Sequence, residues 1–327
     1  MDERELIERV WKFLRRDPYE LLGFDDAQAA ELKGKIVANL DVFDEVTDWL
    51  PGMTLCDVGW KSVVMGVSDV LVKGAKPLGV MLGLGLPEEL LDFVDDLLIG
   101  IREACDDLSI HLWGGDTGAS DHLYIAVVAI GVADKLVARR GAKPGDLLMV
   151  ASTGDGIETP VAYQVLLKGA PLCSKAHEAI RKAFRPRLVK AEFWLGIADY
   201  VTASIDDSDG FALSLHQLAE SSGVKLVLDR VPISFALAEC AEAWGINPVE
   251  MALYAGGEEY SFIFTTPREK EEEIIEKARK HNVQVWKIGR VEKGTGVYLR
   301  DYGEVERRGW VHFATDQWSA TSRLHVR

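Results

Sequence analysis

The sequence predicts a two-domain α+β protein, and three observations lead to this class. The chain has 327 residues, more than one domain usually holds, so two domains are expected. Apolar runs typical of strands alternate with helix-like segments in both halves. A turn-rich segment at 139–146, Arg-Arg-Gly-Ala-Lys-Pro-Gly-Asp, separates the halves. We therefore expect one domain at residues 1–135 and a second at 136–327.

The first half begins with apolar residues at helical spacing, which predict a helix over residues 2–16. The apolar stretch 36–41 predicts a strand that ends at Asp41. A helix over 60–73 is expected to stop at Gly74, before Lys-Pro. The half is completed by strands at 78–86, 111–113 and 123–132 and by a helix that begins at Pro87.

The second half opens with a strand at 147–151, followed by the glycine-bearing loop 153–156. Such a loop can cradle a phosphate, but a tight turn is the favoured interpretation. The acidic segment 204–210 leads into a helix that ends near Ser222, and residues 224–228 predict a further strand. A final α/β portion follows.

Composition argues against two kinds of partner. The formal net charge of −15 argues against binding to nucleic acid, because nucleic-acid phosphates are bound by clustered Lys and Arg. The longest apolar run, 78–86, is nine residues, well short of the roughly 18 that a spanning helix needs. The charged start, Met1-Asp-Glu-Arg-Glu, has no apolar core typical of a secretion signal. We expect a cytoplasmic protein that binds neither nucleic acid nor membrane.

The four cysteines lie far apart and form no CxxC pair. This spacing predicts buried thiols, neither a disulfide framework nor a zinc site. They are Cys56, Cys105, Cys173 and Cys240.

Several aspartates share one local pattern, an apolar strand or helix followed by Asp beside Gly or Ser. Glycine lets a ligand approach the backbone, and Mg²⁺ takes oxygen ligands while bridging carboxylates to phosphates. Each motif alone is more typical of a turn or helix cap, but together they predict a set of metal ligands. The motifs are Asp25-Asp26, Asp41, Ser68-Asp69, Gly114-Gly-Asp116 and Asp206-Asp-Ser-Asp209-Gly.

Other nucleotide-binding patterns are absent from the sequence. It contains no GxxxxGK[ST] phosphate loop, no GxGxxG opening a βαβ unit and no protein-kinase catalytic loop. Ser208 lies beside Asp209, but it lacks the GxSxG elbow of a hydrolase nucleophile. The acidic motifs therefore remain the candidates for binding a phosphate, through Mg²⁺.

Six segments occur in the order seen in the thiamine-monophosphate kinase family. That family belongs to the aminoimidazole ribonucleotide synthetase-like superfamily, and the resemblance extends from about Gly23 to Phe313. The segments are Val67-Ser-Asp-Val-Leu-Val-Lys-Gly-Ala-Lys-Pro77, Trp113-Gly-Gly-Asp-Thr117, Arg139-Arg-Gly-Ala-Lys-Pro-Gly-Asp146, Ile205-Asp-Asp-Ser-Asp-Gly210, Gly256-Gly-Glu-Glu-Tyr260 and Gly309-Trp-Val-His-Phe313.

The resemblance implies an N-terminal domain that pairs across a homodimer to form a β-barrel and a C-terminal α/β domain, with ATP between the domains. It implies ATP and thiamine monophosphate as substrates and Mg²⁺ as the metal. The implied Mg²⁺ ligands are Asp26, Asp41, Asp69, Asp116, Asp206 and Asp209, of which Asp41, Asp69 and Asp116 are the expected catalytic carboxylates. The implied nucleotide contacts are Gly115, Asp116, Arg139 and Ser208, and the implied substrate contacts are Asp48, Glu258 and Trp310.

The sequence departs from the family pattern at three places. Asn39-Leu40-Asp41 stands where the bacterial pattern has Ser-Thr-Asp, so Asn39 can replace the serine only through its amide oxygen. Asp48-Trp49 replaces His-Phe, and Glu258-Glu259-Tyr260 replaces Glu-Asp-Tyr. These departures leave the carboxylate set complete and bear on the acceptor substrate.

Three functions follow as hypotheses. The first is phosphoryl transfer from ATP to thiamine monophosphate, giving thiamine diphosphate. The second is a ligase or cyclase reaction at the same ATP site, in which an amide or similar oxygen is phosphorylated. The third is a nucleotide-binding dimer without turnover, which is disfavoured because a carboxylate cluster is costly to hold without a metal.

Overall fold

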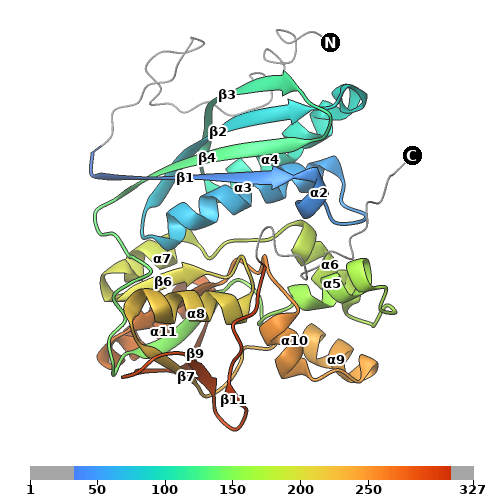
Figure 1. Cartoon of the computed structure of the whole chain (residues 1–327). Helices are drawn as coiled ribbons and strands as arrows, with labels where there is room; N and C mark the ends of the chain where they lie inside the picture. The colour runs from blue at the N-terminus through green and yellow to red at the C-terminus, as the bar shows by residue number, and fades with distance from the viewer. Residues whose placement is uncertain (1–32, 311–327) are drawn as a thin grey trace. The chain divides into compact units, whose positions relative to one another are not determined.

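The computed structural model describes residues 33–310 (Figure 1). The helix predicted over 2–16 lies outside the described residues. The chain divides into two compact units, Met1–Leu136 and Val137–Arg327. Among the helices between residues 33 and 310, none is long and apolar enough to cross a membrane.

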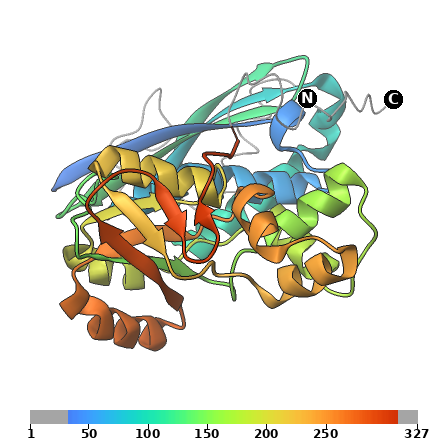
Figure 2. The ribbon, with the colours of Figure 1, turned by 60° about the horizontal axis from the view of Figure 1, so that its bottom comes forward.

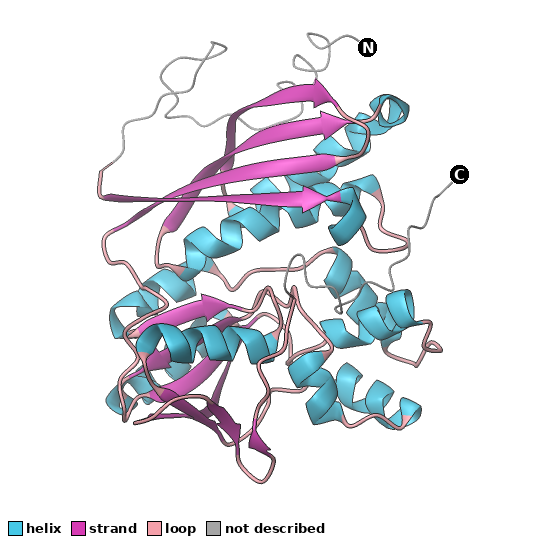
Figure 3. Cartoon of the chain, in the orientation of Figure 1, coloured by secondary structure: helices cyan, strands magenta, loops and turns pink. Residues whose placement is uncertain are grey.

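The first unit contains a four-stranded sheet with strand order β1-β4-β2-β3 (Figure 3). β1 and β2 both run antiparallel to β4, and β3 runs parallel to β2. Its elements are β1 (Lys35–Asp44), α2 (Glu45–Asp48), α3 (Leu55–Val72), β2 (Lys76–Leu86), the 3₁₀ helix η1 (Glu88–Phe93), α4 (Val94–Leu108), β3 (His111–Ala119) and β4 (Tyr124–Ala133).

Helices α3 and α4 pack against each other, and α3 lies on the sheet. A capping box between Thr54 and Asp57 begins α3, because each side chain accepts a hydrogen bond from the other residue's backbone N–H. The two helices approach closely at Gly100, where an added Cβ would overlap the carbonyl oxygen of Cys56. This glycine therefore allows α4 to pack closely on α3, which itself contacts β1, β2 and β4.

The sequence placed the strands and helices of this unit well but misjudged three boundaries. Asp41 lies inside β1, three residues before its end, because the pairing with β4 continues to Asp44. The strand expected at 111–113 extends to Ala119 by pairing with β2. The helix expected to begin at Pro87 starts as η1, and the α-helix begins at Val94.

One face of this sheet carries exposed apolar side chains. Ile36, Leu40 and Val42 on β1 are 64%, 62% and 41% exposed. Leu40 pairs with Val128 of β4, which lies half-buried on the same face. The alternate residues of β1 face α3, as the period of two requires.

The second unit contains a seven-stranded sheet with strand order β11-β10-β7-β9-β5-β8-β6. Its strands are β5 (Leu147–Ser152), β6 (Ala203–Asp206), β7 (Lys225–Leu228), β8 (Phe262–Thr266), β9 (Gln284–Glu292), β10 (Val297–Leu299) and β11 (Gly303–Glu304). Its helices are α5 (Thr159–Lys168), α6 (Ala176–Phe184), α7 (Ala191–Ile197), η2 (Ala198–Tyr200), α8 (Phe211–Ser222), α9 (Phe235–Trp244), α10 (Pro248–Tyr254), η3 (Arg268–Lys270) and α11 (Glu271–His281).

The helices of this unit form separate groups. α7 and α11 contact each other, and α8 packs beside β6 and β7. α5, α6, α9 and α10 gather at one side of the sheet, as two views show (Figures 1 and 2). A continuous apolar core joins this helical group to the sheet through residues such as Val161, Leu215 and Leu237. Mixed strands and helices in both units confirm the α+β class.

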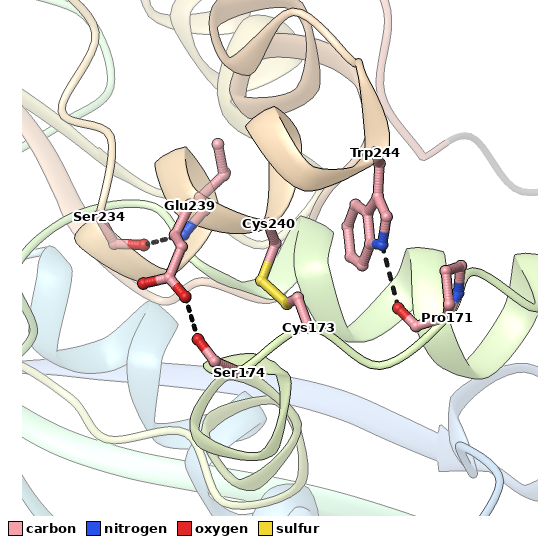
Figure 4. Close-up of a disulfide and its surroundings, with 8 residues drawn as sticks. Pro171, Cys173, Ser174, Ser234, Glu239, Cys240 and Trp244 are labelled. Carbon is pink, nitrogen blue, oxygen red and sulfur yellow. Dashed lines mark hydrogen bonds between the residues drawn. A yellow bond between two sulfur atoms is a disulfide. The ribbon is translucent and has the colours of Figure 1, made fainter.

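The prediction that all four cysteines are thiols was wrong for two of them. Cys173, between α5 and α6, forms a disulfide with Cys240 of α9 (Figure 4). The two Cα atoms are 5.5 Å apart, although 67 residues separate them in sequence. No sequence spacing could reveal this pair, because the packing of α9 against α5 and α6 creates it. Cys56 and Cys105 are free.

The disulfide predicts a measurable loss of stability on its removal. Closing a loop of this length is worth about 4 kcal/mol in the chain-entropy model. We expect Cys173→Ala/Cys240→Ala to unfold at a markedly lower urea concentration than the wild type, with reductant affecting only the wild type. Four reactive thiols in denatured, unreduced wild type, in place of two, would contradict the disulfide.

Candidate active site

Three chain segments converge in the second unit at the start of α8. Glu258 N donates a hydrogen bond to Ser208 O at 2.6 Å, and Trp310 N donates to Asp209 O at 2.7 Å. Tyr260 N donates to Asp207 O at 2.9 Å. The β6–α8 loop, the loop 256–260 and the segment 309–310 are therefore joined through their backbones.

Glycine is required where these segments meet. Gly210 has φ +104°, and an added Cβ would lie 2.6 Å from Gly256 O. A Cβ on Gly309 would lie 2.5 Å from Asp209 O. Any larger side chain would separate the backbones, so the glycines of these motifs permit the convergence.

The site residues predicted in this half of the chain lie together, with one exception. Asp206 ends β6, and Ser208 and Asp209 follow it in the chain. Glu258 and Trp310 are joined to Ser208 and Asp209 by the backbone hydrogen bonds above. Gly210 is the N-cap of α8, so the unpaired N–H groups of its first turn lie beside Asp209. Such a helix start favours a phosphate.

Arg139 is the exception. Its carbonyl accepts a hydrogen bond from Ser222 Oγ, at the last residue of α8. Twelve residues of helix separate this point from the Asp209 end, a rise of roughly 18 Å. Within the second unit, Arg139 therefore lies at the opposite end of α8 from Ser208.

Glu258 is held in an uncommon backbone conformation. Its φ is +54° and that of Tyr260 is +50°, both in the left-handed region that non-glycine residues seldom adopt. The hydroxyl of Tyr163 on α5 hydrogen-bonds the Glu258 carboxylate, and Thr159 Oγ1 donates to Gly257 O at 2.8 Å. Contacts from α5 therefore hold the loop in addition to its backbone bonds to the β6–α8 loop.

Behind this loop lies a buried charge cluster centred on Lys182. The Lys182 ammonium pairs with Glu259, donates to Gly156 O at 3.1 Å and lies 3.8 Å from Glu158. Burial lowers the pKa of Lys182, but the Glu259 carboxylate outweighs it and the net shift is upward. Lys182 therefore remains a cation inside the cluster.

Carboxylates outnumber the lysine in this cluster. Burial, reinforced by Glu259, Asp206 and Asp209, raises the pKa of Asp207 well above its usual value. Asp207 Oδ1 is buried and has no hydrogen-bond partner among the described residues. An orphaned carboxylate oxygen beside further acidic groups is an environment that a divalent cation fits, because Mg²⁺ prefers oxygen ligands. The residues present therefore fit Mg²⁺.

In the first unit, Asp41 lies on the sheet and Asp69 on α3, the helix that packs against it. Asp41 pairs with Val127 of β4. A Cβ on Gly66 of α3 would lie 2.9 Å from Val127 Cγ1, so this part of α3 lies directly over the strand pair. Asp69 follows Gly66 by three residues, so both lie on the same side of α3.

Asp116 and Gly115 lie at the other edge of this sheet. Asp116 is on β3 and pairs with Gly83 of β2, and its Oδ1 accepts a hydrogen bond from Thr117 N. β1 and β3 are separated by β4 and β2, a distance of roughly 14 Å at the usual strand spacing. One Mg²⁺ cannot bind Asp41 and Asp116 of the same chain.

Two further predicted site residues are Asp48 and Asp26. Asp48 ends α2, where its carboxylate accepts a hydrogen bond from Asp44 N at 2.7 Å and its carbonyl accepts one from the buried Lys61 at 3.1 Å. Asp26 lies outside the described residues. Between residues 33 and 310, no three His, Cys, Asp or Glu side chains are arranged to hold one metal ion.

Sequence reasoning missed Lys182, Glu259 and Tyr163. One signal was present: in α6, Lys182 follows the buried Ala179 by three residues and precedes the buried Ala183. A lysine on the apolar side of a helix is unusual unless a carboxylate pairs with it. The partner, Glu259, is too distant in sequence for the pattern to identify.

The two units match the AIR synthase related protein family. Residues 24–133 match its N-terminal domain and residues 143–302 its C-terminal domain. These domains and the acidic site define the class of the protein as AIR synthase related.

Full-length relatives narrow this class. Thiamine-monophosphate kinase of Aquifex aeolicus (strain VF5) is 32% identical over 318 residues, covering 96% of this chain and 98% of the relative. The enzyme of Pyrococcus abyssi (strain GE5 / Orsay) is 33% identical over 321 residues, 96% of each chain. The chain belongs to the thiamine-monophosphate kinase family.

Solved structures agree with this assignment. Thiamine-monophosphate kinase from Stenotrophomonas maltophilia K279a superposes with a TM-score of 0.81 at 27% identity, covering 92% of this chain and 96% of the other. AaThiL complexed with AMPPCP and TMP gives a TM-score of 0.76 at 31% identity, covering 95% and 96%.

The charge cluster predicts a pH-dependent stability. Burial raises the pKa of Glu158 from 4.5 to about 7, opposed by Lys182 and reinforced by Glu259. The folded state therefore holds this proton up to about pH 7, whereas the unfolded chain releases it near 4.5. The stabilisation is complete below pH 4.5 and is lost as pH rises through 7.

Glu158→Gln removes this titration. At pH 8 the variant should be more stable than the wild type, by at most about 3 kcal/mol, and at pH 4.5 the two should be alike. Urea unfolding at both pH values measures the difference. A constant difference across this range would show that Glu158 does not carry the raised pKa.

Proposed function

We propose that this chain transfers the γ-phosphoryl group of ATP to the phosphate of thiamine monophosphate, giving thiamine diphosphate and ADP in the cytoplasm. The observation that carries the proposal is the full-length match to thiamine-monophosphate kinases, one of them solved with AMPPCP and TMP. The convergence of Ser208, Glu258 and Trp310 at the start of α8 supports it, since it joins a phosphate-binding helix end to an aromatic side chain.

The chemistry requires charge compensation more than proton transfer. The acceptor phosphate is already ionised at neutral pH, so it needs no general base. Donor and acceptor repel each other, and catalysis consists of alignment and electrostatic stabilisation. Mg²⁺, when bound, neutralises phosphate charge. We assign the binding of several Mg²⁺ ions to Asp26, Asp41, Asp69, Asp116, Asp206 and Asp209, because one ion cannot reach both Asp41 and Asp116 of the same chain.

The chain's own groups align the nucleotide. Ser208 and the first-turn N–H groups of α8 offer hydrogen-bond donors to phosphate oxygens, and the helix dipole adds a partial positive charge. We assign nucleotide contacts to Gly115 and Arg139 as well, and Arg139 would contact a part of the nucleotide other than the phosphate at Ser208, because the two lie at opposite ends of α8. Gly115 adds no side chain, which allows close approach of the backbone. Arg139 supplies a permanent cation.

The remaining residues recognise the acceptor. Trp310 presents a half-buried aromatic ring beside Asp209, suited to packing on the thiamine rings. Glu258 supplies a carboxylate whose direction is fixed by Tyr163. We assign a further substrate contact to Asp48, which stands where the family pattern has His.

We also propose a homodimer in which the first units pair to form a β-barrel. The exposed apolar face of β1, with Ile36, Leu40 and Val42, supports this pairing. A second copy would cover these side chains and remove them from water, the main favourable contribution to association.

The function is tested by incubating the protein with ATP, Mg²⁺ and thiamine monophosphate and separating the products by chromatography. Wild type should form thiamine diphosphate and ADP in equal amounts, and removal of Mg²⁺ by EDTA should stop the reaction. Asp69→Asn should lower kcat at least about 100-fold, because it removes a metal-binding carboxylate. Asp107→Asn, an exposed aspartate in the same unit, is the control. ADP release without thiamine diphosphate would refute the proposed acceptor.

The dimer is tested by a charge placed on the apolar face. Leu40→Glu should convert the protein from a dimer to a monomer of 36.1 kDa, because an unpaired carboxylate would be buried on association. Light scattering after gel filtration gives the mass. Phe93→Glu, also at an exposed apolar residue but on η1, should stay dimeric. A wild-type mass of 36.1 kDa would refute the dimer.

A further inference from the structure

The loop 256–260 holds a conformation that its own backbone disfavours. Glu258 and Tyr260 both have positive φ, and they flank Glu259. Residues kept in such conformations are found where surrounding contacts hold them, often at functional sites. The contacts of Glu259, together with those of Tyr163 and Thr159, therefore decide how Glu258 is presented.

Glu259 is the anchor of this loop. One carboxylate oxygen accepts hydrogen bonds from Glu158 N and Thr159 N, both at 3.0 Å, at the first turn of α5. The other oxygen pairs with Lys182. The Glu259 side chain is only 1% exposed, so no water replaces these partners. All of its acceptor positions in the described structure are directed to α5 and α6.

Lys182 connects the anchor to three parts of the unit. It reaches from α6 to Glu259, to the carbonyl of Gly156 and to the vicinity of Glu158. Its side chain is 16% exposed, and no other cation is recorded in contact with Glu259 among the described residues. Without this cation, Glu259 and Glu158 would be buried carboxylates close to each other, which is strongly unfavourable.

We propose that Lys182 is a positioning residue for the acceptor substrate: through Glu259 it fixes the loop 256–260 and thereby the direction of Glu258. The inference rests on the proposed function, because it takes Glu258 as a contact of the acceptor, which is a phosphate ester of thiamine. Lys182 touches neither substrate nor metal in this scheme. Its effect passes through Glu259, one residue from Glu258, so it acts more strongly on acceptor binding than on the nucleotide contact of Ser208, which the loop reaches through the Glu258 N–H.

The main test uses a neutral pair, Lys182→Met/Glu259→Gln. The glutamine oxygen can still accept from Glu158 N and Thr159 N. Glu158 loses its cation, but its pKa is already raised to about 7, so it takes up a proton and the fold is retained. We expect KM for thiamine monophosphate to rise about tenfold, the usual effect of losing a charge-assisted hydrogen bond, with KM for ATP within about twofold.

A merely structural role would give another result. Lower stability alone reduces the fraction of active enzyme, and therefore kcat, but leaves both KM values of the folded enzyme unchanged. Glu158→Gln is the matched control, because Glu158 also faces Lys182 but is not part of the loop. Its KM for thiamine monophosphate should stay within about twofold of the wild type.

The outcomes separate this inference from the proposed function. Wild type that forms no thiamine diphosphate refutes both. Active wild type with an unchanged KM for thiamine monophosphate in the double variant, or with both KM values raised alike, refutes the positioning role alone. If the double variant does not fold, Lys182→Arg decides, because it keeps the charge but displaces the donor. It should raise this KM at least about threefold, and an unchanged value refutes the proposal.

Discussion

The ion pair between Lys182 and Glu259 is the interaction on which the site in the second unit depends. Asp206, Asp207, Asp209, Glu158 and Glu259 influence one another, and burial together with neighbouring carboxylates raises the pKa of Asp207 and of Glu158. Lys182 supplies the internal cation, and the backbone N–H groups at the start of α5 share the charge of Glu259. The remaining negative charge is suited to a divalent cation, which can then hold phosphate oxygens on its other side.

The two units contribute in different ways. The first has a sheet with one face on α3 and the other apolar and exposed, so it combines carboxylates near α3 with a surface suited to a second copy. The second builds its site from loops at the end of β6, where glycines allow three segments to approach each other. The disulfide between Cys173 and Cys240 links α9 to the segment between α5 and α6. These two helices carry Lys182 and the α5 contacts to the loop 256–260.

Local patterns were sufficient for most of the fold. Alternation and apolar runs located β1, β2, β4 and β5, and the helix through Ser68 and Asp69 was expected from its small and apolar residues. Errors fell at boundaries that pairing controls. β1 continues past Asp41 and β3 continues past Trp113 because each is hydrogen-bonded to a neighbouring strand over its full length. The local residue pattern does not show where this pairing ends. Acidic motifs beside glycine indicated which residues could serve the chemistry.

The sequence by itself determined the α+β class, the family and the residue types of the site, because these follow from local periodicity and from short motifs in a fixed order. Tertiary structure decided which residues meet. It joined Ser208, Asp209, Glu258 and Trp310, placed Arg139 at the far end of α8 and Asp116 across the sheet from Asp41, and paired Cys173 with Cys240 and Lys182 with Glu259. These contacts span 67 and 77 residues in the last two cases, and only packing brings such distant positions together.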